Sequence, residues 1–301
     1  MNDLPIVDAH QHFWDPERNY YPWLTDQLRP DFRYGDYGAI RRPYLPPHYS
    51  ADTAGHRVVK TVHVEANWDP ADPVGETRWL VEIAARHGVP NAIVAQAWLE
   101  RDDVADVLAA QAAFPQVRGI RQKPAAALSG DAVVRGAPGS MGDPKWRAGY
   151  ALLARHGLSF DLQTPYWHLP EAAELARDFP DTRIILNHTG LPADRGEAGL
   201  AAWRDAIARL AEAPNAVVKI SGLGVPGRPW TVEANRRIVL DTIALFGVER
   251  CMFASNFPVD SLVAGFDTLF RGFQAIVAHL PRADRQRLFH DNAVRYYRLE
   301  G

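Results

Sequence analysis

The chain has 301 residues, of which 47% are hydrophobic and 23% charged, with a formal net charge of −3 at pH 7. That balance is ordinary for a globular protein with a large core. Because no basic tract stands out, nucleic acid and membrane surfaces are not expected as partners. The single cysteine, Cys251, excludes an intrachain disulfide and a cysteine-based zinc cluster.

The elements expected in chain order alternate between strands and helices. Apolar, β-branched runs predict eight strands, at residues 6–10, 58–66, 91–99, 117–122, 158–163, 183–188, 216–221 and 251–256. Amphipathic stretches predict helices at residues 75–88, 170–180, 201–214 and 233–247, and a last helix from about 282 to 297 that should pack on the outside. No apolar run approaches the roughly 18 residues of a membrane span, and the N-terminus lacks a signal-like pattern, so a cytoplasmic protein is expected.

Eight such units predict an α/β protein, a (β/α)8 TIM barrel formed by a single domain over residues 1–301. An open, doubly wound sheet is the alternative, but no Gly-x-Gly-x-x-Gly pattern follows the first strand. Two long loops, residues 13–57 and 123–144, follow the carboxyl ends of the first and fourth strands. Barrel enzymes build their active sites at that end of the barrel, so both loops are expected to border the site.

Polar side chains end or follow strands that are otherwise apolar. They are His10, His12, His63, Glu65, Arg121, Gln163, His188 and Asn256. Because polar groups buried without partners are costly, these side chains are expected to converge on one barrel mouth. The spacing of His10 and His12 sends both imidazoles to one side of a strand, which suits two bonds of about 2.0–2.1 Å to one zinc ion. The alternative is that both histidines only hydrogen-bond to loop groups.

Three motifs carry a resemblance to a known family. The stretches "DAHQHFWD", "LNHTG" and "CMFASNFPVD" together resemble the amidohydrolase superfamily, and more closely its lactonase-like amidohydrolase-2 branch, from Val7 to about Asn292. The resemblance implies a (β/α)8 barrel that hydrolyses ring esters of small acids, with a divalent metal in some members. It also implies that His10, His12 and His188 are the metal ligands.

Two positions depart from that family's pattern. Asn256 stands where the strand-eight aspartate is usual, and Gln163 stands where a strand-five histidine is frequent. An amide carries no charge to stabilise a dication and cannot act as a general base near neutral pH. Three neutral histidines can nevertheless bind zinc with water as a fourth ligand. Glu65 is the candidate replacement, as ligand or base, and the alternative for Glu65 is an ion pair with Arg121.

The remaining candidates concern the substrate and the loops. Arg121 suits a substrate carboxylate, because its planar fork makes paired hydrogen bonds, and a structural salt bridge is the alternative. The further substrate-binding candidates are Gln163, His63, Trp68 and Trp167. Aromatic residues of the first long loop either line the pocket or only anchor that loop: Trp14, Tyr20, Tyr21, Trp23, Tyr44 and Tyr49. Asp260 is expected to cap the start of a helix.

We therefore expect a hydrolase that opens a small sugar-acid or dicarboxylate lactone by water attack, with Glu65, Asn256 and His188 as catalytic residues. One divalent metal, zinc in the first place, is the expected cofactor. The expected partner is a small-molecule lactone, and formation of a homo-oligomer is left open. The alternatives are a metal-independent lactone isomerase, a catalytically silent barrel that binds a sugar acid, and a decarboxylase that uses the same ligands.

Overall fold

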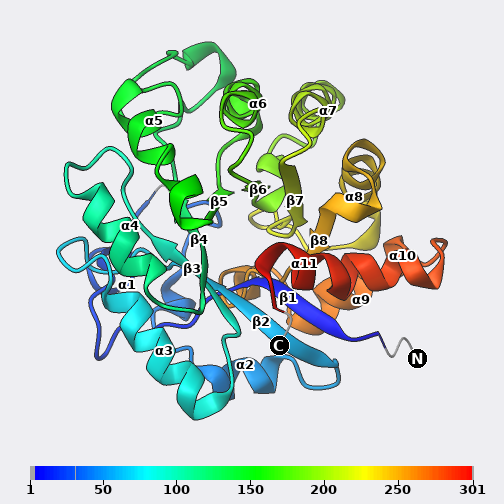
Figure 1. The fold of residues 1–301 in the computed structure, drawn as a ribbon. Coiled ribbons are helices and arrows are strands. Elements are labelled where there is room, and N and C mark those ends of the chain that lie inside the picture. Colours follow the sequence, from blue (N-terminus) through cyan, green and yellow to red (C-terminus); the bar gives the residue numbers. More distant parts are fainter. Residues whose placement is uncertain (1–3, 31, 300–301) are drawn as a thin grey trace.

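The strands form one closed parallel barrel. In the computed structural model, which describes residues 4–30 and 32–299, eight strands follow one another in sheet order, each pairing in parallel with the next (Figure 1). They are β1 Ile6–Gln11, β2 Val58–Val64, β3 Ala92–Gln96, β4 Val117–Gln122, β5 Ser159–Leu162, β6 Ile184–Leu186, β7 Ala216–Ile220 and β8 Cys251–Phe253. The barrel closes where the amide of His12 donates to the carbonyl of Phe257 and the amide of Asn256 donates to the carbonyl of His10, both at 2.7 Å. The predicted (β/α)8 TIM barrel is confirmed.

The helices surround this barrel (Figure 1). They are α1 Pro22–Thr25, α2 Pro46–Asp52, α3 Gly75–His87, α4 Val104–Ala112, α5 Pro144–Tyr150, α6 Leu169–Asp178, α7 Glu197–Ala211, α8 Val232–Phe246, α9 Phe266–Ile276, α10 Arg282–Gln286 and α11 Asn292–Tyr297. Gly88 ends α3 as predicted, because its φ of 77° lets its amide donate to the carbonyl of Ala84 at 2.8 Å. Within the described ranges, no helix has both the length and the apolar character needed to cross a bilayer.

Several strands are shorter than predicted at their carboxyl ends. Strand β8 ends at Phe253 rather than at residue 256, and Asn256 has a φ of 57°. A left-handed residue cannot continue a strand, so Asn256 belongs to a loop that forms the mouth, as do Gln163 and His188, whereas His10 and Arg121 lie within β1 and β4.

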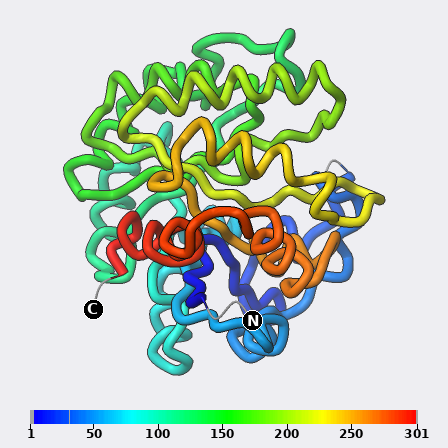
Figure 2. Tube along the Cα trace, turned by 90° about the vertical axis from the view of Figure 1, so that its right-hand side faces the viewer, coloured from blue at the N-terminus to red at the C-terminus, as the bar shows by residue number. Residues whose placement is uncertain are grey.

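The C-terminal segment closes the amino-terminal end of the barrel. Helix α10 continues through a π-helical segment, Arg287–Asp291, into α11, and this segment, red in Figures 1 and 2, lies against β1. Tyr297 and Leu299 belong to the same buried cluster as Val62 of β2, and Arg118 of β4 donates to the carbonyl of Tyr297 at 3.0 Å. The prediction that this helix packs on the outside was wrong, because its apolar face covers the open end of the barrel and not its wall.

A buried ion pair crosses the barrel interior. Lys219 of β7 donates to Asp161 of β5 at 2.6 Å, and both side chains are 0% exposed. The hydroxyl of Tyr297 donates to the same carboxylate at 2.9 Å. Desolvation lowers the pKa of the Lys219 ammonium to about 8, although Asp161 opposes that shift. The pair therefore connects two strands of the barrel to its C-terminal helix.

Candidate active site

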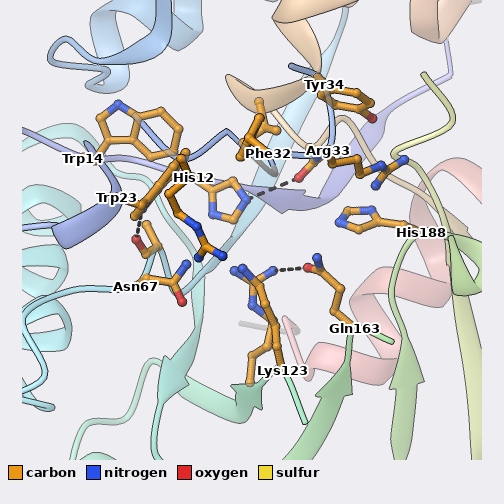
Figure 3. A pocket seen from close by; sticks show the side chains of 15 residues that line it. His12, Trp14, Trp23, Phe32, Arg33, Tyr34, Asn67, Lys123, Gln163 and His188 are labelled. Atoms are coloured by element: carbon orange, nitrogen blue, oxygen red, sulfur yellow. Dashed lines mark hydrogen bonds between the residues drawn. The ribbon is translucent and has the colours of Figure 1, made fainter. Parts of the chain in front are cut away.

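A pocket of about 690 Å³, including its open mouth, lies at the carboxyl ends of the strands (Figure 3). Its lining comes from strand ends and from the first long loop: His12, Trp14, Trp23, Arg29, Phe32, Arg33, Tyr34, Ala66, Asn67, Arg121, Lys123, Gln163, His188, Asn256 and Val259. Six of the predicted strand-end residues meet at or directly below this pocket. They are His10, His12, Arg121, Gln163, His188 and Asn256.

Three acceptor atoms converge at the base of the pocket. The Nδ1 atom of His12 lies 2.6 Å from the carbonyl of Val64, so Nδ1 carries the proton and Nε2 of the neutral ring is an acceptor. This Nε2 atom lies 3.3 Å from Nε2 of His10 and 3.3 Å from Oδ1 of Asn256. A donor, Nη1 of Arg121, lies 3.5 Å from the same nitrogen of His10, which makes that nitrogen an acceptor as well.

Acceptors that face one another cannot satisfy one another, but they can share a cation. Two ligands of one tetrahedral zinc, each at about 2.0–2.1 Å, lie about 3.3–3.4 Å apart, and the two separations around His12 match that edge. The ring centroid of His188 lies 4.7 Å from that of His10. Among the described residues, no three His, Cys, Asp or Glu side chains already form a metal-binding group. The donors that converge are two imidazole nitrogens and one amide oxygen, and both kinds of atom bind divalent metals, so the donor set fits such a metal.

The three histidines are held in their neutral form. Burial lowers the pKa of His10, His12 and His188 well below the usual value. The next cause in each case is a different cation: Lys219 for His10, Arg121 for His12 and Arg33 for His188. Neutral imidazole is the form that binds metals, so the surroundings favour a ligand role.

Glu65 is engaged by its neighbours. Its Oε1 atom accepts from Nε of Arg121 at 2.6 Å, and its Oε2 atom accepts from the amide of Asn67 at 2.7 Å. Desolvation raises the pKa of Glu65, but Arg121 and Lys123 outweigh it and the pKa lies below its usual value. A carboxylate with both oxygens occupied and a lowered pKa is a poor base. The geometry therefore matches the ion-pair alternative for Glu65.

Asn256 is oriented by a second carboxylate. Its Nδ2 atom donates to Oδ1 of Asp260 at 2.7 Å, which turns its own Oδ1 toward His12. The hydroxyl of Tyr34 also donates to Asp260, at 3.0 Å. Asp260 is 1% exposed, and burial raises its pKa to about 6. The prediction that Asp260 caps a helix was wrong, because its side chain points to Asn256 and the short 3-10 helix Val259–Leu262 has no side-chain cap.

Backbone geometry positions His188. It has a φ of 55°, and two other pocket residues, Asn67 and Asn256, have φ values of 53° and 57°. Nδ1 of His188 lies 2.9 Å from the hydroxyl of Ser221. A Cβ atom on Gly222, whose φ is 61°, would lie 2.7 Å from the imidazole ring. The ring therefore occupies space that only glycine leaves free.

Three predicted substrate contacts lie elsewhere. His63 faces away from the mouth: it accepts from the amide of Phe13 and approaches Glu76 of α3 at 3.2 Å. The expectation that it joins the other strand-end residues at the mouth was wrong, because in β2 it alternates with Val62 and Val64, whose side chains face the interior. Trp68 packs between Tyr21 and Trp79, and Trp167 donates to the carbonyl of Ala127.

The aromatic residues of the first long loop divide between both expected roles. Trp14 and Trp23 line the pocket. Tyr21, Tyr44 and Tyr49 are buried in the packing of the loop, and Tyr20 is 44% exposed.

Sequence reasoning missed several lining residues, of which Arg29, Arg33 and Lys123 are charged. Arg29, Arg33 and Tyr34 come from the first long loop, and Lys123 directly follows β4. The one available signal was that Lys123 lies two positions after Arg121, so it can turn to the same side. The loop residues gave no comparable signal, because loop conformation does not follow from spacing.

A (β/α)8 barrel that gathers histidines, an arginine and an amide oxygen around a pocket at its carboxyl face is a barrel enzyme acting on small molecules. The chain belongs to the amidohydrolase family, because the family model described as "Amidohydrolase" matches residues 7–299. It is accordingly a hydrolase, and the resemblance read from the three motifs is confirmed.

Relatives of similar length match nearly the whole chain. The sequence is 46% identical over 299 residues to "Uncharacterized protein y4mH" of Sinorhizobium fredii, covering 99% of this chain and 100% of that one. It is 29% identical over 305 residues to an L-fucono-1,5-lactonase of Burkholderia ambifaria, covering 98% and 96% of the two chains. A crystal structure of a Burkholderia multivorans amidohydrolase with bound HEPES has a TM-score of 0.81 at 26% identity over 98% and 99% of the chains. A second crystal form with bound zinc has a TM-score of 0.80 with the same identity and coverage.

Proposed function

We propose that this chain opens the ring of a small sugar-acid or dicarboxylate lactone by adding water, with a divalent metal, zinc, held by His10, His12 and His188. The observation that carries the proposal is the convergence of neutral acceptors beside Arg121 at the base of the pocket. The L-fucono-1,5-lactonases among the relatives support a lactone substrate. The zinc in a similar amidohydrolase structure supports the metal.

The chemistry requires few groups. Water oxygen bonds to the ester carbonyl carbon, the ring C–O bond breaks, the ring oxygen takes up a proton, and the acid formed releases one to solvent. When bound, the metal supplies Lewis acidity and lowers the pKa of water. Arg121, which also donates to Gln163 at 3.2 Å, can donate to the carbonyl oxygen as negative charge develops there. Oδ1 of Asn256 can accept a hydrogen bond from the attacking water, and Glu65 acts through Arg121 as a positioning residue.

A metal-independent lactone isomerase remains the second candidate. The observation that favours it is that none of the described residues lining the pocket is Asp or Glu, so no lining carboxylate can take a proton from water. Acyl transfer between two hydroxyls of the substrate changes the ring size and releases no acid. Acid release at neutral pH therefore separates hydrolysis from isomerisation.

The first test is metal content by mass spectrometry on protein purified without a metal-affinity column. We expect about one zinc per chain, lost in His12→Ala and retained in His279→Ala, whose histidine is exposed and outside the pocket. Acid release from a lactone panel is then followed with a pH indicator, before and after removal of the metal with a chelator. A chain that takes up no zinc contradicts the metal site, and ring-size change without acid release contradicts hydrolysis.

A further inference from the structure

The pocket concentrates positive charge. Four of its lining residues are cationic, Arg29, Arg33, Arg121 and Lys123, whereas its described lining includes no carboxylate. The whole chain carries a net charge of −3, so this excess is local to the pocket. A concave site lined by one sign of charge focuses its field on ligands of the opposite sign.

The nearby carboxylates neutralise only part of this charge. Arg121 forms a buried ion pair with Glu65, and the two side chains are 3% and 2% exposed. Arg33 donates to the carbonyl of Gly222 and lies over the ring of Tyr34, but makes no ion pair with a described residue. Lys123 has neither an ion pair nor a hydrogen bond with any residue in the described ranges. Two cations in the pocket are therefore available to a ligand.

The cations in and behind the pocket also destabilise one another's charged forms. Desolvation, followed by the charge of Arg121, lowers the pKa of Lys123 to about 8. Desolvation, followed by the charge of Arg33, lowers the pKa of Arg195 to about 10, and the guanidinium of Arg195 donates to the carbonyl of Leu223 behind the pocket. An anion in the pocket would reduce this repulsion. An uncharged ligand would remove water from the cations without providing a compensating charge.

The two available cations lie on different walls. Figure 3 shows Arg33 beside His188, on the loop segment that also carries Phe32 and Tyr34, and Lys123 across the pocket below Gln163. His12 and Asn256 lie at the base. A ring ester placed over the base therefore directs its substituents toward one cation or the other.

We propose that the substrate is a lactone that carries at least one free carboxylate outside the ring, and that Arg33 and Lys123 select it over an uncharged sugar lactone. This inference rests on the proposed lactonase function and narrows its substrate class. It also departs from the L-fucono-1,5-lactonases among the relatives, since L-fucono-1,5-lactone is an uncharged ring ester.

The test compares two lactones that differ in one group. D-Glucaro-1,4-lactone has a carboxylate where D-glucono-1,4-lactone has a hydroxymethyl group. We expect the wild type to have the higher kcat/KM on the charged lactone, mainly through KM. Because a hydrogen bond to a charged group is strong, Arg33→Met and Lys123→Met should each lose about 10- to 150-fold on the charged lactone and less than about threefold on the neutral one.

The matched control is Arg86→Met, which removes one cation from an exposed helical pair with Glu82 and should change neither substrate's kinetics. Lys123→Arg should retain most of the selectivity at neutral pH, because it keeps the charge. Equal kcat/KM for the two lactones in the wild type, or equal losses on both in the variants, would overturn the inference.

A binding experiment separates this inference from the proposed function. Calorimetric titration compares isophthalate, a planar dianion, with isophthalamide, which has the same shape without charge. If neither lactone is hydrolysed, the lactonase proposal fails. The inference that Arg33 and Lys123 select carboxylates is still supported if the wild type binds isophthalate in preference to isophthalamide and both Met variants lose that preference. Absence of isophthalate binding, or equal affinity for the two compounds, overturns it.

Discussion

Replacing Lys219 by methionine is expected to destabilise the barrel strongly. The substitution leaves Asp161 fully buried, with the hydroxyl of Tyr297 as its remaining described donor. Removing one member of such a pair costs about 3–5 kcal/mol. At about 2.1 cal/mol/K per residue, a chain of this length unfolds with an entropy of about 0.63 kcal/mol/K, so the midpoint of thermal unfolding should fall by about 5–8 °C.

The assay is thermal unfolding followed by circular dichroism at pH 7, with and without added zinc. The control is the double variant Lys219→Met, Asp161→Leu, which removes both charges and should recover most of the loss, because apolar replacement of a buried pair is often neutral. A fall of less than about 2 °C in the single variant, or equal destabilisation of the single and double variants, would refute the view that these charges stabilise each other inside the barrel.

Three further changes test the mouth of the barrel. The double variant Asn256→Asp, Asp260→Asn moves the carboxylate next to the proposed metal and should tighten zinc binding at least about tenfold in competition with a chelator. Asn256→Asp alone sets two carboxylates where a 2.7 Å hydrogen bond now lies and should lower the stability of the metal-free protein. Unchanged zinc affinity in the double variant would contradict a metal beside position 256. Because the pKa of Lys123 is about 8, kcat/KM for a carboxylated lactone should fall as the pH rises through 8 and the cation is lost. Lys123→Arg should keep its kcat/KM to higher pH, and identical pH profiles for the two proteins would count against binding of the carboxylate by Lys123. Gly222→Ala should displace the His188 ring and reduce the zinc content of the protein. The control is Gly227→Ala: Gly227 has a φ of 67° and open space around it, so this change should lower stability without affecting zinc content. Equal zinc content in both variants would show that the close approach of Gly222 to His188 is unimportant.

The barrel could be predicted because its signal is repeated. Each of the eight apolar runs is weak alone, but their alternation with amphipathic helices admits few architectures. The site residues at strand ends could be predicted for a related reason. In a parallel barrel every carboxyl end faces the same mouth, so His10, His188 and Asn256 meet although they lie far apart in the sequence.

Other features depend on the exact path of the chain. The side to which His63 points is decided by which alternate residues of β2 face the barrel interior, and a shift of the strand by one residue would reverse it. Arg33 reaches the pocket because a loop folds over the mouth, and no periodicity reports such a fold. The apolar face of α11 is equally compatible with the wall of a barrel and with its open end, so only the three-dimensional structure distinguishes them.

The left-handed backbone at Asn67, His188 and Asn256 has a consequence for engineering. Such a conformation costs a residue with a side chain about 1–2 kcal/mol, and less for asparagine. Glycine would remove that cost, but at His188 and Asn256 it would also empty the space that a buried side chain fills and, at Asn256, remove the 2.7 Å hydrogen bond to Asp260. Asn67 is only partly buried, and its backbone amide would still donate to Glu65 after the exchange. A screen that rewards heat resistance alone should therefore recover glycine at Asn67, which deletes one side chain from the pocket lining, and should retain His188 and Asn256.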